Sequence, residues 1–85
     1  MTALTPALAL QYLAELEPAL EAVAIAGTDG APLAGDPSLP ARLAVGGGAM
    51  VVGRGPRHVV IAQIPRGALE GLVRHDLEAV ARDLG

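Results

Sequence analysis

Positions 22–35 read AVAIAGTDGAPLAG, and this stretch does most to decide the fold. Branched and small apolar side chains fill positions 22–26, and Asp29-Gly30 follows shortly after them. An Asp-Gly pair between two apolar runs is the strongest short-range signal for a β-hairpin, because both residues accept the backbone angles of a tight turn. We therefore predict a strand over 22–26 that turns and returns over 31–35.

A second hairpin is predicted further along the chain. Positions 49–52 read AMVV and are strand-like, and GRGP at 53–56 supplies the glycine and proline that turns require. The strongest strand in the sequence is HVVIAQI at 58–64. It is apolar on both faces, so we expect it to lie centrally in the sheet with both sides covered.

The segment between the two hairpins, 36–48, is irregular. Pro37, Pro40 and the three glycines at 46–48 interrupt it. These breakers leave room for about one turn of helix, around 39–43.

A helix is predicted at each end of the chain. Thr5-Pro6 is typical of a helix cap followed by proline at the first helical position, and Pro18 ends the helix near Leu16. The first helix has apolar side chains at helical spacing, at Leu8, Tyr12, Leu13 and Leu16. The last helix, 68–84, has one apolar stripe composed of Leu69, Leu72, Val73, Leu77, Val80 and Leu84.

Asp76 interrupts the stripe of the last helix. One interpretation is a carboxylate at the edge of the stripe that meets solvent or a nearby arginine, since an unpaired buried charge is costly. The other is a polar contact across a subunit interface.

The order helix, hairpin, short segment, hairpin, helix predicts an α/β fold of the α+β sandwich type. Its small antiparallel sheet has about four strands, flanked by N- and C-terminal helices. The 85 residues form a single domain, 1–85, because a chain of this length supports one core. The composition is 52% hydrophobic with one tyrosine as the only aromatic, so part of the aliphatic surface is expected to face another subunit.

The composition excludes several classes of function. The net charge of −3 and the lack of a basic stripe argue against nucleic-acid binding. Without cysteine or lysine there is no thiolate nucleophile, Schiff base or ordinary phosphate-binding loop. Ser38 lies in a proline-braced turn, and His58 and His75 lack zinc-ligand spacing. We expect no catalytic residues, no cofactor and no metal.

The N-terminal apolar run predicts neither a signal peptide nor a membrane span. It has no basic region before it, and Glu15 and Glu17 interrupt it. The absence of cysteine is typical of a cytoplasmic protein, which is the location that we expect.

Positions 22–34, AVAIAGTDGAPLA, resemble the first hairpin of the roadblock/dynein light-chain family. Positions 59–65 followed by LEGLVR at 69–74 are similar to the last strand and final helix of that family. The resemblance implies a Longin- or profilin-like α/β sandwich that acts as a homodimer and regulates or scaffolds small GTPases. Too little chain lies between Gly35 and Ala49 for the middle helix and following strand of the family, so the resemblance is to a shortened form.

We therefore predict a non-catalytic protein-interaction module that associates with itself and binds a small GTPase. The expected interface combines Leu39, Leu43, Met50 and Val52, with Arg54 and Arg57 at its rim and Asp76 as a polar contact. The edge of the strand at 49–52 offers a route to pairing by strand addition.

Two alternatives from other classes stay open. The first is a small-molecule sensor domain of Longin/profilin-like fold, although polar and aromatic residues that line ligand pockets are sparse here. The second is an enzyme that uses Asp29 or Asp76 with a histidine, for which the sequence supplies no convergent acid–base pair.

Overall fold

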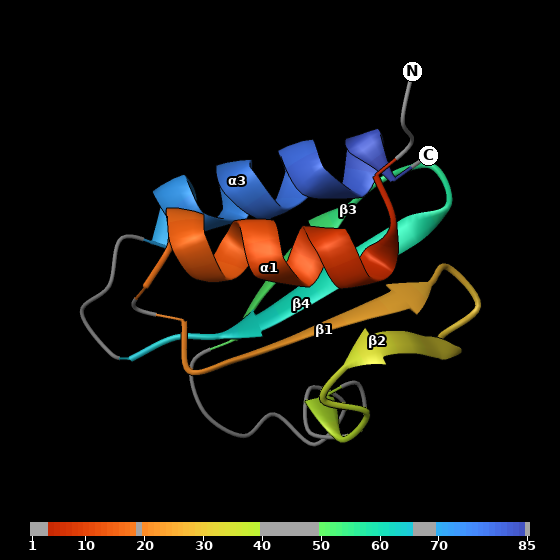
Figure 1. Ribbon diagram of the computed structural model, residues 1–85, viewed down its shortest axis with the longest axis horizontal. Coiled ribbons are helices and arrows are strands. Elements are labelled where there is room, and N and C mark those ends of the chain that lie inside the picture. The colour runs from red at the N-terminus through yellow and green to blue at the C-terminus, as the bar shows by residue number, and fades with distance from the viewer. Residues whose placement is uncertain (1–3, 19, 40–49, 66–69, 85) are drawn as a thin grey trace.

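The computed structural model describes residues 4–18, 20–39, 50–65 and 70–84 (Figure 1). Its elements in chain order are α1 (Pro6–Leu16), β1 (Ala22–Gly27), β2 (Pro32–Gly35), β3 (Met50–Arg54), β4 (His58–Gln63) and α3 (Glu70–Asp83). The strands form one antiparallel sheet in the order β2-β1-β4-β3. The predicted fold class, a four-stranded antiparallel sheet flanked by an N-terminal and a C-terminal helix, is confirmed.

Both helices lie side by side on the same face of the sheet (Figure 1). The helix α1 packs on β1 and β2, whereas α3 packs on β3 and β4. The colour gradient in Figure 1 shows that the two helices run in opposite directions, so the C-terminal end of α1 lies beside the N-terminal half of α3.

The core has a layer on each face of the sheet. Between the sheet and the helices lie Ala9, Leu13, Ile25, Val51, Val60, Ala62, Ile64, Val73, Leu77, Val80 and Ala81. On the opposite face Leu39 packs with Ala24, Val59 and Ile61. The central position of β4 and the covering of both its faces therefore agree with the prediction from its continuous apolar run.

The predicted boundaries of α1 are confirmed. The hydroxyl of Thr5 accepts a hydrogen bond from the Leu8 N–H at 3.2 Å, and Pro6 occupies the first turn. The helix ends at Leu16, and the Glu17 N–H donates to the Leu13 carbonyl at 2.9 Å.

The helix α1 buries only one side chain of its predicted apolar row, Leu13. Its fully buried side chains are Ala9 and Leu13. Leu8, Tyr12 and Leu16 are instead 46%, 51% and 42% exposed. The small Ala9 side chain brings α1 close to the sheet on one flank, and the three larger side chains lie on the other.

The first hairpin forms as its sequence predicts. The Asp29 carboxylate accepts a hydrogen bond from the Ala31 N–H at 3.0 Å, and Gly30 has a φ of 89°. The β1–β2 register shifts between Ile25 and Ala26, and Gly35 ends β2 with a φ of 82°. Only glycine takes such angles without strain, so the turn and the end of β2 both depend on it.

The last helix buries a narrower stripe than the sequence predicts. Val73, Leu77 and Val80 are buried as expected, and the unpredicted Ala81 joins them. Leu72, predicted within the stripe, is 55% exposed. Of the turn of helix predicted around 39–43, positions 40–43 lie outside the described residues, as do Leu69 and the predicted start of the last helix at 68.

Candidate functional site

The strand β3 lies at one edge of the sheet and holds three of the predicted interface residues. Because side chains alternate along a strand, Met50, Val52 and Arg54 share one face. Val51 belongs to the core under the helices, whereas Met50 and Val52 pack around the second core layer on the opposite face. The structure therefore brings these three residues into one row.

The backbone groups of the same row point away from β4. The Gly55 N–H donates to the His58 carbonyl at 2.8 Å, and the Cα register continues with Gly53 opposite Val60 and Val51 opposite Ala62. Hydrogen-bonded and non-bonded pairs alternate in an antiparallel ladder. The N–H and C=O groups of Met50, Val52 and Arg54 are consequently directed outward, and no described strand pairs with them. We call this row the β3 edge.

The opposite edge of the sheet is less suited to pairing. It is formed by β2, which has four residues and begins with Pro32. Proline has no N–H to donate, and short strands with proline or a bulge are the usual protection against strand addition. The β3 edge contains no proline, and its one charged residue, Arg54, stands at its end.

The remaining predicted interface residues do not all join the β3 edge. Arg57 is exposed in the β3–β4 turn, next to the end of the row. Leu39 lies against the correct face but is 0% exposed, so it belongs to the core of this chain and its side chain is not accessible to a partner. Leu43 lies outside the described residues.

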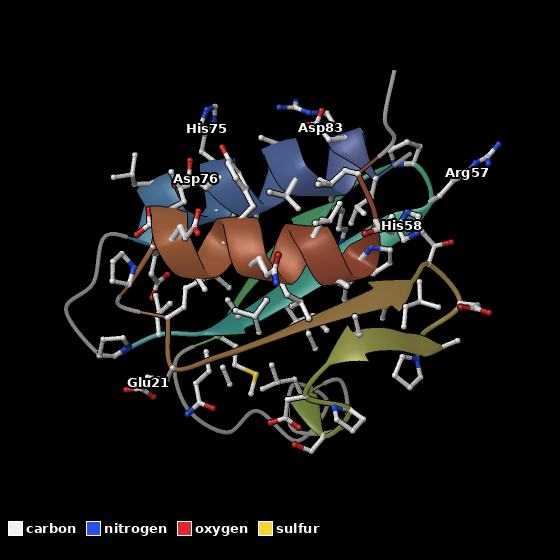
Figure 2. The ribbon with its side chains drawn as sticks, viewed as in Figure 1. Glu21, Arg57, His58, His75, Asp76 and Asp83 are labelled. Atoms are coloured by element: carbon white, nitrogen blue, oxygen red, sulfur yellow. The ribbon has the colours of Figure 1, made fainter. Side chains whose placement is uncertain are left out.

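Asp76 lies apart from the β3 edge, on the helix layer. Figure 2 shows Asp76 on α3 and Arg57 at the far end of the molecule. The side chain beside Asp76 is Glu17, at the C-terminal end of α1. The hydrogen bond that the two carboxyl groups share raises the pKa of Glu17 above its ordinary value of 4.5, with further contributions from partial burial and from the Asp76 charge. The sequence had no signal for this pair, because its members come from opposite ends of the chain.

The glycines of Gly53-Arg54-Gly55 allow close packing between β3 and α3. A Cβ on Gly53 would lie 2.5 Å from the backbone nitrogen of Glu78, and one on Gly55 would lie 2.5 Å from the Ala81 carbonyl oxygen. The sequence assigned both glycines to turn chemistry, which is wrong for Gly53, because Gly53 lies within β3. Their contacts show that they also set the distance between the helix and the sheet.

The two histidines lie apart and do not form a joint site. His75 projects outward from α3, while His58 begins β4 (Figure 2). The Nδ1 atom of His58 is buried and has no hydrogen-bond partner among the residues that the structure describes. Within residues 4–18, 20–39, 50–65 and 70–84, no group of three or more His, Asp or Glu side chains has metal-binding geometry.

Comparison of the chain with known protein families, with curated proteins and with solved structures finds no match. In the described part of the chain, neither helix has the length and apolar character needed to cross a lipid bilayer.

Proposed function

We propose that this protein is a non-catalytic protein-interaction module and that a second polypeptide adds a strand at the β3 edge. The observation that carries the proposal is the outward direction of the backbone groups of Met50, Val52 and Arg54. Strand addition uses such backbone groups for affinity and alternate side chains for specificity.

The side chains of the β3 edge support the same function. Met50 and Val52 are half-buried, so each presents apolar surface next to the outward-directed backbone groups. The exposed Arg54 and Arg57 stand at one end of the row. Positive charge at the rim of an apolar contact increases the association rate with an acidic partner more than it increases affinity.

Two partners follow from the sequence. One is a second copy of the chain, which the high aliphatic content of a short sequence favours. The other is a small GTPase, which rests on the resemblance of the hairpin and last helix to the roadblock family. The protein acts in the cytoplasm under this proposal.

The test uses a substitution that removes one outward N–H and leaves the β3–β4 ladder intact. Val52→Pro does this, because the Val52 N–H points away from β4. Val52→Ala is the matched control, since it trims the side chain but keeps the N–H. Native mass by light scattering across a dilution series is measured for both, together with binding to purified small GTPases loaded with GDP or a non-hydrolysable GTP analogue.

We expect Val52→Pro to abolish binding of the polypeptide that adds its strand at the β3 edge, and Val52→Ala to retain most of that binding. Circular dichroism should show that both variants keep the wild-type fold. A folded Val52→Pro variant that associates and binds as the wild type does would remove the β3 edge from consideration.

A further inference from the structure

The helix α1 presents an apolar row that the fold leaves uncovered. Leu8, Tyr12 and Leu16 follow one another at intervals of four residues and are 46%, 51% and 42% exposed. Residues at this spacing lie on one face of a helix, so the row runs along about 12 Å of it. We call it the α1 stripe.

Apolar surface continues from the α1 stripe onto α3. Leu72, which is 55% exposed, lies one turn before Asp76 on the same flank of α3. Asp76 in turn contacts Glu17, which follows Leu16 directly. The helix layer therefore carries four large exposed apolar side chains, with a carboxyl pair beside them at the C-terminal end of α1.

The charges of α1 are arranged unfavourably within the monomer. A helix has a partial positive charge at its N-terminus and a partial negative charge at its C-terminus. The first turn of α1 contains no acidic residue, and its last turn contains no basic one. Glu15, Glu17 and the adjacent Asp76 place negative charge at the end that is already negative.

We propose that a second copy of this chain covers the α1 stripe, with the two α1 helices packed antiparallel about a twofold axis at Tyr12. In this arrangement Leu8 of one copy meets Leu16 of the other, and the two tyrosines meet at the centre. A twofold interface must be self-complementary, and the sequence of the stripe, Leu-Tyr-Leu at equal intervals, reads the same in both directions.

The electrostatics of the pairing favour the same arrangement. Each acidic C-terminal end of α1 lies beside the partially positive N-terminal end of the other copy, so both helix ends gain a partner of opposite sign. A lipid surface is a poorer match, because α1 has no lysine or arginine for anionic headgroups.

This inference rests on the proposed function for the claim that the chain self-associates, and it assigns that self-association to α1. The β3 edge lies on the other side of the molecule from this interface, at the edge and opposite face of the sheet. It is then free to take a strand from a different polypeptide.

The experiment is a charge-complementation test on the full chain. Leu8→Lys and Leu16→Glu each place a charge in the antiparallel contact, and mixing the two variants brings those opposite charges together in a mixed dimer. Ala14→Lys is the matched control, because Ala14 is exposed on the other side of α1 from Tyr12. Native mass is measured by light scattering for each variant and for the mixture, and circular dichroism confirms the fold.

We expect the wild type and Ala14→Lys to have twice the monomer mass of 8.5 kDa. Leu8→Lys and Leu16→Glu alone should weaken the dimer by at least about tenfold, because each buries an unpaired charge. The mixture should regain the dimer mass. With parallel pairing the mixture would not regain the dimer mass, because position 8 of one copy would meet position 8 of the other and the two opposite charges would stay apart.

Three results overturn the inference: a wild type that is monomeric at every concentration, single variants that dimerise as the wild type does, or a mixture that stays monomeric.

The β3 edge is judged separately with Val52→Pro. If Val52→Pro alone abolishes the dimer, the α1 inference fails and the proposed function stands. If only the α1 variants abolish the dimer, the inference stands. The effect of Val52→Pro on binding to small GTPases then tests whether the β3 edge is a binding site.

Discussion

Gly53 of β3 lies directly against Leu77 of α3. A Cβ on Gly53 would stand 2.5 Å from the Leu77 carbonyl carbon and 2.6 Å from the Leu77 Cβ. Real Cβ atoms do not approach other heavy atoms so closely, and the nearest neighbours here include backbone, which cannot move aside by a rotamer change. The absence of a side chain at this position thus fixes how closely the last helix sits on the sheet.

Gly53→Ala should therefore destabilise the protein by about 1–3 kcal/mol, since the added methyl group forces α3 away from β3. Gly71→Ala is the matched control, because nothing lies within 4 Å of a Cβ built there. Alanine is the better helix former, so Gly71→Ala should leave stability unchanged or raise it by up to about 1 kcal/mol. Urea unfolding followed by circular dichroism measures both, and equal effects would show that Gly53 is not closely packed.

Leu39→Ala distinguishes a core residue from an interface residue. Leu39 is fully buried against the face of the sheet opposite the helices, so its truncation should cost about 2–5 kcal/mol of unfolding free energy. Leu33→Ala, at a leucine that is 50% exposed, should change stability by no more than about 0.5 kcal/mol. A Leu39→Ala variant of wild-type stability that had lost self-association would instead place Leu39 at an interface.

Glu17→Gln tests the carboxyl pair through its dependence on pH. The raised pKa of Glu17 means that folding favours its protonated form, so the stabilising contribution is complete below the ordinary value of 4.5 and is lost as pH rises through the raised pKa. Above its raised pKa, Glu17 is charged and is repelled by the negative charge of Asp76. Glu17→Gln should stabilise the protein at pH 7, by less than about 1 kcal/mol because both groups are partly solvated.

The advantage of Glu17→Gln should disappear below pH 4.5, where Glu17 of the wild type is protonated and donates to Asp76. Thermal unfolding of both proteins across a pH series measures this, with Glu21→Gln as the control at an exposed glutamate outside the pair. A pH-independent difference, or an identical response from Glu21→Gln, would show that the pair does not act as described.

The order of the helices and strands was predicted correctly from local sequence signals. Thr5-Pro6 begins α1 because a cap needs only neighbouring residues: the Thr5 hydroxyl bonds to an N–H three positions away. Asp29-Gly30 makes the first hairpin for the same reason. The central place of β4 was also predicted from the sequence, because a strand covered on both faces has a nearly continuous apolar run, here 59–62.

Which face each helix buries depends on how the helix packs against the sheet. The sequence predicted one apolar row on α1, but the packing buries only Leu13 of that row, together with Ala9, and leaves Leu8, Tyr12 and Leu16 exposed. Periodicity identifies a helix, but it does not measure how closely that helix approaches its neighbours.

The contacts at the candidate sites could not be predicted from the sequence, for a related reason. The outward row of β3 depends on strand order and register, and the Glu17–Asp76 pair depends on two antiparallel helices sharing one face of the sheet. Local signals act through bonds to residues a few positions away. These relationships join segments far apart in the chain, and only the packing of the completed fold brings them together.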